Sequence, residues 1–444
     1  MNTENLIAED RERHLFRVHR SVMTSEEILA TEREQIFDRC WLYIGHESEV
    51  EHPGDFHRRE VAGRPLIFIR GKDNVVRVFH NSCTHWGAKV CRVDHGTADT
   101  FQCFYHAWTF NNLGRLVGIP DAGGYPPDFD RDELALRQPP RVSNYRGLYF
   151  VSFDPDVEPL DQYLGAAREY MDLILDQSEA GMRIVSGTQL YTVRANWKLI
   201  ATNSLDTYHA PPLHTTYFSY MAKFKGSDIG SETKSSSMGG GGIGRSLGNG
   251  HGVGESSPGG LARPIAHWHP MFGEAARGEI AQIRARIVER FGEERAWRMC
   301  DTFRLFLIYP NLVFHDAMAI TLRYFEPAGP DAVRMTVWAM APKDESDAQL
   351  ERRLNNFVSF LGPGGFAHPD DLEAVESCQD GFRSHEIEWS DFSRGLCREP
   401  ELMDELPMRA FWRKWHAQMM GIPRTAQVDD PPRNGFASHQ SAGK

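Results

Sequence analysis

The sequence has few cysteines, no long apolar run and no excess of positive charge, and each shortage excludes a class of protein. Its seven cysteines are an odd number scattered over 444 residues, which is not the pattern of a secreted disulfide framework. No stretch reaches the roughly 18–20 apolar residues that a membrane span needs, and no apolar secretory core follows the first methionine. We therefore expect a cytoplasmic protein without a membrane partner.

Basic side chains are too few for a nucleic-acid-binding surface. The chain has 49 Lys and Arg against 61 Asp and Glu, a net charge of −12. Because nucleic-acid binding depends on Lys and Arg facing phosphates, this charge argues against a nucleic-acid partner and leaves room for a basic protein partner. Hydrophobic residues make up 41% of the chain, which excludes wholesale disorder, and the length allows about two or three domains.

The sequence pattern changes near residue 155, from short strand-like runs to helical segments, which predicts two domains. Before that point, four strand-like runs separated by Gly and Asn predict a small antiparallel β domain over 41–155: Pro65–Arg70, Val75–His80, Thr100–Phe110 and Gly147–Phe153. A capping box at Thr24–Glu27 predicts an amphipathic helix that runs towards Cys40. It belongs to an N-terminal helical segment, 1–40, which we expect to pack on the larger domain.

The larger domain is expected at 156–424, followed by a flexible tail at 425–444. Helices are predicted at Leu160–Leu175, Trp197–His209, Ala275–Phe291, Ala348–Leu361 and from Pro369, where a proline suits the first helical position. Strands of a second sheet are predicted at Phe303–Phe325 and Ala332–Ala341. The fold class is therefore α+β, with a small all-β domain placed before a larger domain of sheet and helices.

Glycine is concentrated in one segment. Residues 226–260 contain 13 of the 39 glycines and few apolar side chains, which predicts a long mobile loop, either a lid or a disordered insertion. The stretch GIGRSLGNG inside it has some likeness to a phosphate-binding loop. No predicted strand precedes it, so we expect no nucleotide site there.

Four metal-binding side chains occur in two short segments, Cys83-x-His85 and Cys103-x-x-His106, with 17 residues between them. Two thiolates and two imidazoles can hold zinc or an iron–sulfur cluster. A zinc finger usually groups its cysteines and its histidines separately, whereas here each segment supplies one of each. This arrangement predicts a Rieske [2Fe–2S] cluster, in which both Cys bind one iron and both His the other. Cys91 lies outside the spacing and is expected to be structural.

A second group of polar side chains contains Asp206, His209 and His214. On an unbroken helix, residues five apart lie about 140° apart and could not share one ion. Pro211 and Pro212 should stop such a helix and let His214 fold back towards His209. A histidine pair by itself also fits two ordinary core or surface histidines.

Taken together, the two groups resemble the α (large) subunits of ring-hydroxylating non-haem iron oxygenases, over about residues 41–379. The family's first motif is usually Cys-x-His-Arg-Gly followed by Cys-x-Tyr-His-Gly-Trp; here Trp86 replaces the Arg and Ala107 replaces the second Gly. Its second motif is Asn-x-x-Asp-x-Tyr-His-x4-His, usually preceded by Glu, where this chain has Thr202. These departures spare every ligand, but Trp86 alters the surface on which an electron donor would dock.

The resemblance implies a larger domain with an antiparallel sheet flanked by helices, and a mononuclear Fe(II) site in it. His209 and His214 are the implied imidazole ligands, and the third is a carboxylate at the start of a downstream helix. Asp371 matches that place, and Asp370 is the alternative, since an Asp beside Pro369 can also serve only to cap the helix. Two imidazoles and one carboxylate on one face of Fe(II) leave positions open for O2.

The resemblance also implies partners. Asp206 matches the carboxylate that connects the iron-binding His209 to a Rieske histidine, here His106, of the neighbouring subunit, in a trimer of α chains with or without a small β subunit. The chain has no dinucleotide or flavin fingerprint, so NAD(P)H oxidation is assigned to a separate reductase, acting through a ferredoxin.

The implied reaction is cis-dihydroxylation of an aromatic ring, although some relatives carry out monooxygenation or demethylation. Arg323 and Arg394 resemble the pocket arginines of members that act on aromatic carboxylates, where a guanidinium can pair both carboxylate oxygens. We therefore expect an aromatic acid, with p-cumate, terephthalate and benzoate-type acids as candidates in that order. The alternatives are surface salt bridges for the arginines with a neutral substrate, and, in a different class, a zinc-stabilised binding protein.

Overall fold

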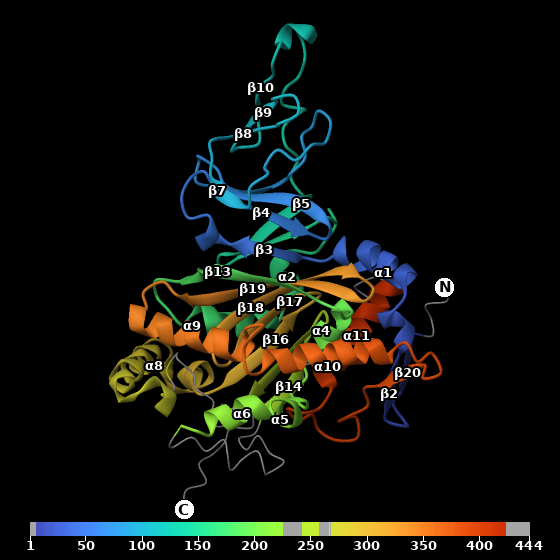
Figure 1. Ribbon diagram of the computed structural model, residues 1–444, viewed down its shortest axis with the longest axis vertical. Helices are drawn as coiled ribbons and strands as arrows, with labels where there is room; N and C mark the ends of the chain where they lie inside the picture. Colours follow the sequence, from blue (N-terminus) through green and yellow to red (C-terminus); the bar gives the residue numbers. More distant parts are fainter. Residues whose placement is uncertain (1–5, 225–241, 257–265, 267, 423–444) are drawn as a thin grey trace, which may run out of the picture.

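A computed structural model of the chain describes residues 6–224, 242–256, 266 and 268–422. A small β part, residues 42–152, forms one end of the elongated molecule, and a larger part of one wide sheet with surrounding helices forms the rest (Figure 1). The expected α+β architecture is confirmed. Within the described ranges, no helix is both long and apolar enough to pass through a membrane.

The small part contains three antiparallel sheets, in the orders β6-β5-β4-β7, β10-β9-β8 and β11-β12-β3. Their strands are β3 (Leu42–His46), β4 (Asp55–Val61), β5 (Arg64–Arg70), β6 (Val76–His80), β7 (His95–Thr97), β8 (Thr100–Gln102), β9 (Thr109–Asn111), β10 (Leu116–Gly118), β11 (Arg141–Tyr145) and β12 (Leu148–Ser152). The single strand predicted at Thr100–Phe110 is wrong. It is broken into β8 and β9 because the segment from Cys103 to Trp108 forms a tight loop, with Ala107 at a φ of +57°.

The larger part is built on a seven-stranded antiparallel sheet in the order β13-β19-β18-β17-β16-β15-β14. Its strands are β13 (Met182–Val193), β14 (Gly242–Gly248), β15 (His251–Ser256), β16 (Phe303–Ile308), β17 (Leu312–Asp316), β18 (Ile320–Gly329) and β19 (Ala332–Pro342). The central strands are apolar in long runs because both faces of the sheet are covered, so their sequences show little alternation.

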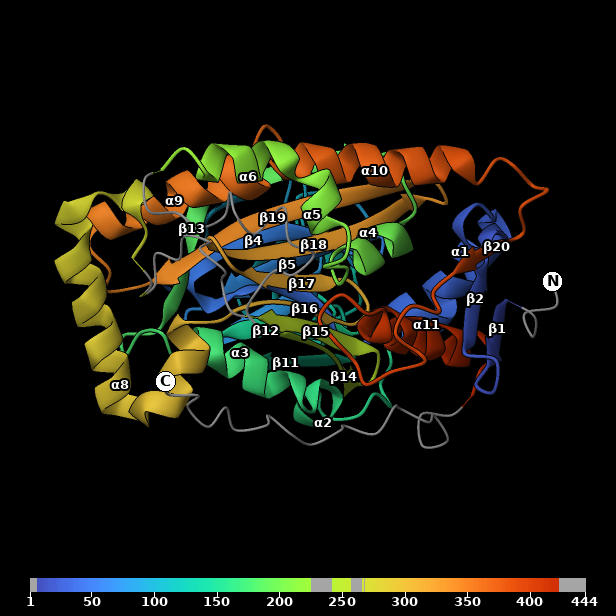
Figure 2. The same cartoon turned by 90° about the horizontal axis from the view of Figure 1, so that it is seen from below.

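Helices surround this sheet (Figure 2). They are α2 (Leu160–Leu164), α3 (Ala167–Leu175), α4 (Trp197–Asn203), α5 (Ala210–Leu213), α6 (Thr215–Met221), α8 (Arg277–Cys300), α9 (Asp347–Leu361), α10 (His368–Gly381) and α11 (Leu406–Met419). Helices α6, α9 and α10 lie along one side of the larger part, and α8 closes one end of it (Figure 2). The helix predicted over Trp197–His209 is too long, since α4 ends at Asn203.

The N-terminal segment is joined to the larger part. It contains β1 (Ile7–Asp10), β2 (Leu15–His19) and α1 (Glu26–Glu32), and β2 pairs with β20 (Trp389–Asp391). At the end of α1, the fully buried carboxylate of Glu32 accepts hydrogen bonds from the indole N–H groups of Trp197 and Trp415, both at 2.7 Å, and pairs with Lys198 Nζ at 2.6 Å. These contacts fix the start of α4, which leads to the histidine pair.

The loop predicted for residues 226–260 is wrong for residues 242–256, while residues 226–241 and 257–260 lie outside the described part. Residues 242–256 form the hairpin β14–β15 at the edge of the large sheet. Glycine is needed there because α11 packs directly on the hairpin. A Cβ atom on Gly252 would come within 2.9 Å of the Pro407 side chain, and one on Gly244 within 3.1 Å. The stretch GIGRSLGNG is therefore a strand and its turn.

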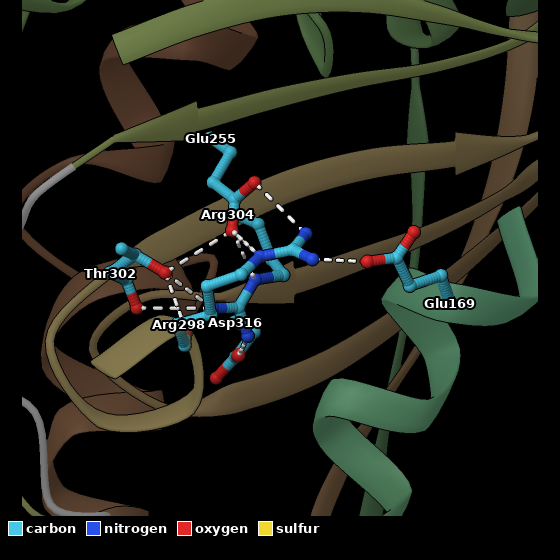
Figure 3. A network of polar contacts seen from close by, with 6 residues as sticks. All are labelled: Glu169, Glu255, Arg298, Thr302, Arg304 and Asp316. Carbon is cyan, nitrogen blue, oxygen red and sulfur yellow. Dashed lines mark hydrogen bonds and ion pairs between the residues drawn. The ribbon is translucent and has the colours of Figure 1, made fainter. Parts of the chain in front are cut away.

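Buried charges connect this hairpin to α8 and to the central strands (Figure 3). Arg298 of α8 binds Glu169 of α3 and, at 3.3 Å, Glu255 of β15. Arg304 of β16 is fully buried and pairs with Asp316 of β17 at 2.6 Å. Unpaired buried charges are costly, so this network holds α3, α8 and three strands in one relative position.

Candidate metal centres and substrate pocket

The two Cys/His loops of the small part have the same backbone geometry. In each loop the cysteine C=O accepts a hydrogen bond from the residue four positions on, Gly87 at 2.8 Å and Ala107 at 2.9 Å. Both of these residues have positive φ, +80° and +57°. The matching turns present each cysteine and its histidine to the space between the loops.

The two cysteines of these loops lie together and so do the two histidines, which is the arrangement that a Rieske cluster requires. Cys83 and Cys103 are buried and neighbour each other, and burial is the largest cause that raises the pKa of the Cys83 thiol. The rings of His85 and His106 lie together, with centroids 4.5 Å apart. His85 Nδ1 is buried without a hydrogen-bond partner among the described residues, which suits a nitrogen that binds metal. Thiols on one side and imidazoles on the other fit a [2Fe–2S] cluster better than zinc.

The second group converges where the single turn α5 meets the start of α10, next to the central strands of the large sheet. Ligand atoms of His209, His214 and Asp371 all lie within 4.8 Å of one another. Asp371 Oδ1 is 3.1 Å from His209 Nε2 and 3.4 Å from His214 Nε2. Two imidazoles and one carboxylate form the facial set that ferrous oxygenases use, so these residues fit a mononuclear iron.

The prolines act differently from the prediction. Pro211 and Pro212 do not stop a helix but lie in the first turn of α5, where the backbone N–H groups have no helical partner to lose. His209 precedes this single turn and His214 follows it, with a ψ of 38° that bends the chain before α6. The short turn brings the two rings to a centroid distance of 5.2 Å.

Asp371, and not Asp370, has its carboxylate among these ligand atoms. It lies in the first turn of α10, where the helix dipole favours negative charge. Burial would raise its pKa, but hydrogen bonds with His209, His214 and His368 hold the pKa of Asp371 well below its usual range. Asp370 Oδ2 instead lies 3.5 Å from Nδ1 of His214, on the ring side away from Asp371. It can orient that ring from outside the site.

Asp206 makes a hydrogen bond with His209. Its Oδ2 is 3.1 Å from His209 Nδ1, and its side chain is partly exposed. Burial lowers the pKa of His209, but Asp206 and Asp371 outweigh it and raise that pKa to about 9. Asp206 can thus hold the imidazole and still reach a group outside the chain.

A mostly apolar pocket opens beside His209, His214 and Asp371. Its apolar lining consists of Ala210, Phe218, Phe303, Leu305, Val313, Ala317, Phe360 and Leu361. Two cationic or basic side chains, His315 of β17 and Arg323 of β18, are buried in this lining. Arg323 Nη2 has no hydrogen-bond partner among the described residues, and neither has His315 Nδ1.

The structure does not bring Arg394 into this pocket. Its Nε donates to the Met403 carbonyl at 2.9 Å, and its guanidinium lies 3.8 Å from the ring centre of Tyr208. The side chain is partly exposed. Arg394 is therefore not among the residues that line this pocket, contrary to the prediction. Its contacts with the Met403 carbonyl and the Tyr208 ring keep it at the surface.

The sequence did not indicate three further side chains that lie around Asp371. Asn203 Nδ2 donates to Asp371 Oδ1 at 3.4 Å, His368 Nδ1 is 3.5 Å from Asp371 Oδ2, and Tyr191 Oη is 2.6 Å from His368 Nε2. The spacing of His368 and Asp371, three apart at the start of a predicted helix, was an available signal. Nothing in the sequence connects Tyr191 to a residue 177 positions away.

Comparisons with known proteins agree with both sites. Residues 40–137 match the family described as Rieske [2Fe-2S] domain, and residues 160–421 match the ring hydroxylating alpha subunit (catalytic domain). The chain belongs to this family of ring-hydroxylating α subunits. It is therefore the terminal oxygenase component of a Rieske non-haem iron dioxygenase, with a [2Fe–2S] cluster and a mononuclear iron as cofactors and O2 as co-substrate.

Individual relatives cover nearly the whole chain. It is 33% identical over 409 residues to the toluate 1,2-dioxygenase subunit alpha of Pseudomonas putida, covering 90% of this chain and 86% of that one. It is 32% identical over 392 residues to the anthranilate 1,2-dioxygenase large subunit of Acinetobacter baylyi, covering 86% and 80%. The crystal structure of naphthalene 1,2-dioxygenase from Rhodococcus sp. bound to indole aligns with a TM-score of 0.77 at 27% identity, covering 91% and 94%. Alpha subunits of this family work with a ferredoxin or reductase and form oligomers.

Proposed function

We propose that this α subunit cis-dihydroxylates the ring of an aromatic carboxylate. The observation that carries the proposal is the buried guanidinium of Arg323, which has an unpartnered Nη2 in the same pocket as the metal-binding side chains. A buried N–H donor without an acceptor is unfavourable, and a substrate carboxylate would supply that acceptor. The names of two relatives contain toluate and anthranilate, which are both benzoate-type acids. These names support a benzoate-type acid as the first candidate substrate, before p-cumate and terephthalate.

In this proposal His209, His214 and Asp371 hold the Fe(II), and Cys83, His85, Cys103 and His106 hold the cluster. When bound, the iron supplies the activation of O2. Arg323 binds the carboxylate and orients the ring, and the apolar wall excludes water from it. Asp206 holds Nδ1 of His209, which leaves Nε2 for the metal.

Electrons would reach the iron from a second copy of the chain. Within one chain, the cluster loop between β8 and β9 lies at one end of the molecule and α5 lies at the other (Figure 1). Asp206 is partly exposed beside His209, so its free side can approach the partner's His106. A head-to-tail contact of this kind can close into a ring, and the ring proposed here is a homotrimer, to which a small β subunit can be added. A ferredoxin or an NAD(P)H-dependent reductase would reduce the cluster.

An Asp206→Ala variant tests this route. We expect it to keep both metal centres and to lose product formation by about 100-fold or more, since removing an outer-shell partner commonly lowers activity by about 10–100-fold and the electron route is lost as well. Metal content, the visible spectrum of the cluster and product yield are measured on the same sample. Normal turnover would refute the route.

The substrate proposal is tested with reconstituted enzyme and a panel containing benzoate, toluates, p-cumate, terephthalate and neutral toluene. Replacing Arg323 with Leu removes a charge-assisted bond, so KM for the preferred acid should rise about 10–100-fold while oxidation of toluene is unaffected or improved. Arg383→Leu, a substitution at an exposed surface pair, is the matched control. An unchanged KM for the acid in the Arg323 variant would contradict the assignment.

A further inference from the structure

A chain of polar contacts runs behind the iron site, from Asp371 through His368 to Tyr191. His368 is the first residue of α10 and is almost fully buried. Its Nδ1 lies 3.5 Å from Asp371 Oδ2, and its Nε2 lies 2.6 Å from the hydroxyl of Tyr191 on β13. The two rings meet edge to face, with centroids 5.6 Å apart.

The two oxygens of Asp371 have different partners. Oδ1 faces His209, His214 and Asn203, which is the side on which a metal would be held. Oδ2 faces His368. Among the described residues, the set whose ligand atoms converge does not include His368, so this histidine is not a fourth ligand.

The chemistry of the groups decides the direction of each hydrogen bond. An ionised carboxylate only accepts, so Nδ1 of His368 must carry the proton. In its neutral form the imidazole carries a single N–H, which Nδ1 then holds. Nε2 must then accept, and the Tyr191 hydroxyl must donate to it. The hydroxyl of Tyr191 therefore selects the tautomer that His368 needs in order to bind Asp371.

We propose that His368 and Tyr191 are positioning residues that hold Asp371 Oδ2 and so keep Oδ1 turned towards His209 and His214, where it would bind the iron. The proposal rests on the part of the proposed function that assigns Fe(II) to the three ligands, and not on the identity of the substrate. Arg323 lies close enough to Tyr191 for its charge to offset part of the rise in Tyr191 pKa that burial causes. The substrate-binding guanidinium and the positioning pair are thus neighbours.

Variants of His368 separate positioning from packing. In His368→Asn the amide N–H can take the place of Nδ1–H, whereas His368→Leu keeps bulk and removes the donor. Apo protein with its Rieske cluster intact is titrated with Fe(II), and the NO adduct of the Fe(II) form is recorded by electron paramagnetic resonance. We expect the Fe(II) Kd to rise about 10–100-fold in His368→Leu and to stay within about threefold of wild type in His368→Asn.

The same measurements test Tyr191. Tyr191→Phe lets His368 adopt either tautomer, so we expect a Kd between those of the two His368 variants and a second NO signal beside the wild-type one. Tyr220→Phe, which removes a hydroxyl outside this chain of contacts, should match wild type. The visible spectrum of the cluster verifies that each variant is folded.

The results that would overturn the proposal are specific. Equal Kd values and NO spectra in His368→Leu and His368→Asn would show that the donor is irrelevant, and a wild-type spectrum in Tyr191→Phe would show that the tautomer is fixed otherwise. Fe(II) binding that persists in His209→Ala would overturn both this proposal and the proposed function. A negative substrate panel with normal Fe(II) binding would affect only the proposed substrate.

Discussion

At the scale of the residue, Ala107 is under strain that can be relieved. It has a φ of +57° in the loop that carries Cys103 and His106, where the family usually has glycine. The left-handed region costs an L-residue about 1–2 kcal/mol, while glycine loses about 0.4–1 kcal/mol more conformational freedom on folding. We expect Ala107→Gly to stabilise the loop by up to about 1 kcal/mol, measured as a higher temperature for loss of the cluster's visible absorption.

The neighbouring loop offers a control. Ala88 directly follows Gly87 and does not have a positive φ, so Ala88→Gly should lower the same temperature. A decrease in both variants would show that the strain at Ala107 is offset by contacts of its methyl group.

Residue-level prediction succeeded where chemistry fixes the spacing. Cys83 lies beside Cys103 and the ring of His85 lies beside that of His106, as their spacing indicated. A loop of this length can present its side chains in only a few ways. Arg394 failed because spacing does not determine the direction in which a surface loop turns its side chain. His368 was missed because its role depends on Tyr191, which reaches it only through the tertiary fold.

At the scale of the element, the glycine-rich hairpin shows why composition misled. A high glycine content predicts a loop, since glycine costs more entropy to order than other residues. In β14 and β15 its lack of a Cβ is what allows α11 to approach the hairpin through Pro407. The entropy cost of ordering these glycines is offset by contacts with partners remote in sequence. These partners are α11 and the charged network of Glu255, Arg298 and Arg304 (Figure 3). No local pattern could indicate it.

Strands and helices with strong local signals were predicted well, and their ends less well. The run Phe303–Phe325 corresponds to three strands, because turns at the ends of β16 and β17 fold it into a meander. A continuous apolar run cannot show where a chain reverses when both faces of the sheet are covered.

At the scale of the whole molecule, one buried carboxylate lies between the cluster domain and the catalytic sheet. Glu326 of β18 accepts a hydrogen bond from the backbone N–H of Ala62, in the turn between β4 and β5, at 2.6 Å. The hydroxyl of Tyr324 donates to the same oxygen at 3.2 Å. Burial raises the pKa of Glu326 from 4.5 to about 7, against the lowering effect of the Ala62 bond.

This raised pKa gives the stability of the molecule a definite pH dependence. Between about pH 4.5 and 7 the folded protein holds a proton on Glu326 that the unfolded chain has lost, so this group's contribution to stability declines as pH rises through that window. The decline is on the order of 3 kcal/mol for a shift of this size. We expect Glu326→Gln, which cannot ionise, to gain stability over wild type as pH rises from 5 to 8.

Denaturation at pH 5, 6, 7 and 8 measures the difference between the two proteins. Glu351→Gln, at an exposed position of α9, serves as the control and should follow the wild-type curve at a constant offset. Because Glu326 bonds the cluster domain through Ala62, the gain should also appear as slower proteolysis of the chain between the two domains at pH 8. A Glu326→Gln difference that stays constant from pH 5 to pH 8 would mean that the carboxylate is already ionised at pH 5, stabilised there by its contacts with Ala62 and Tyr324.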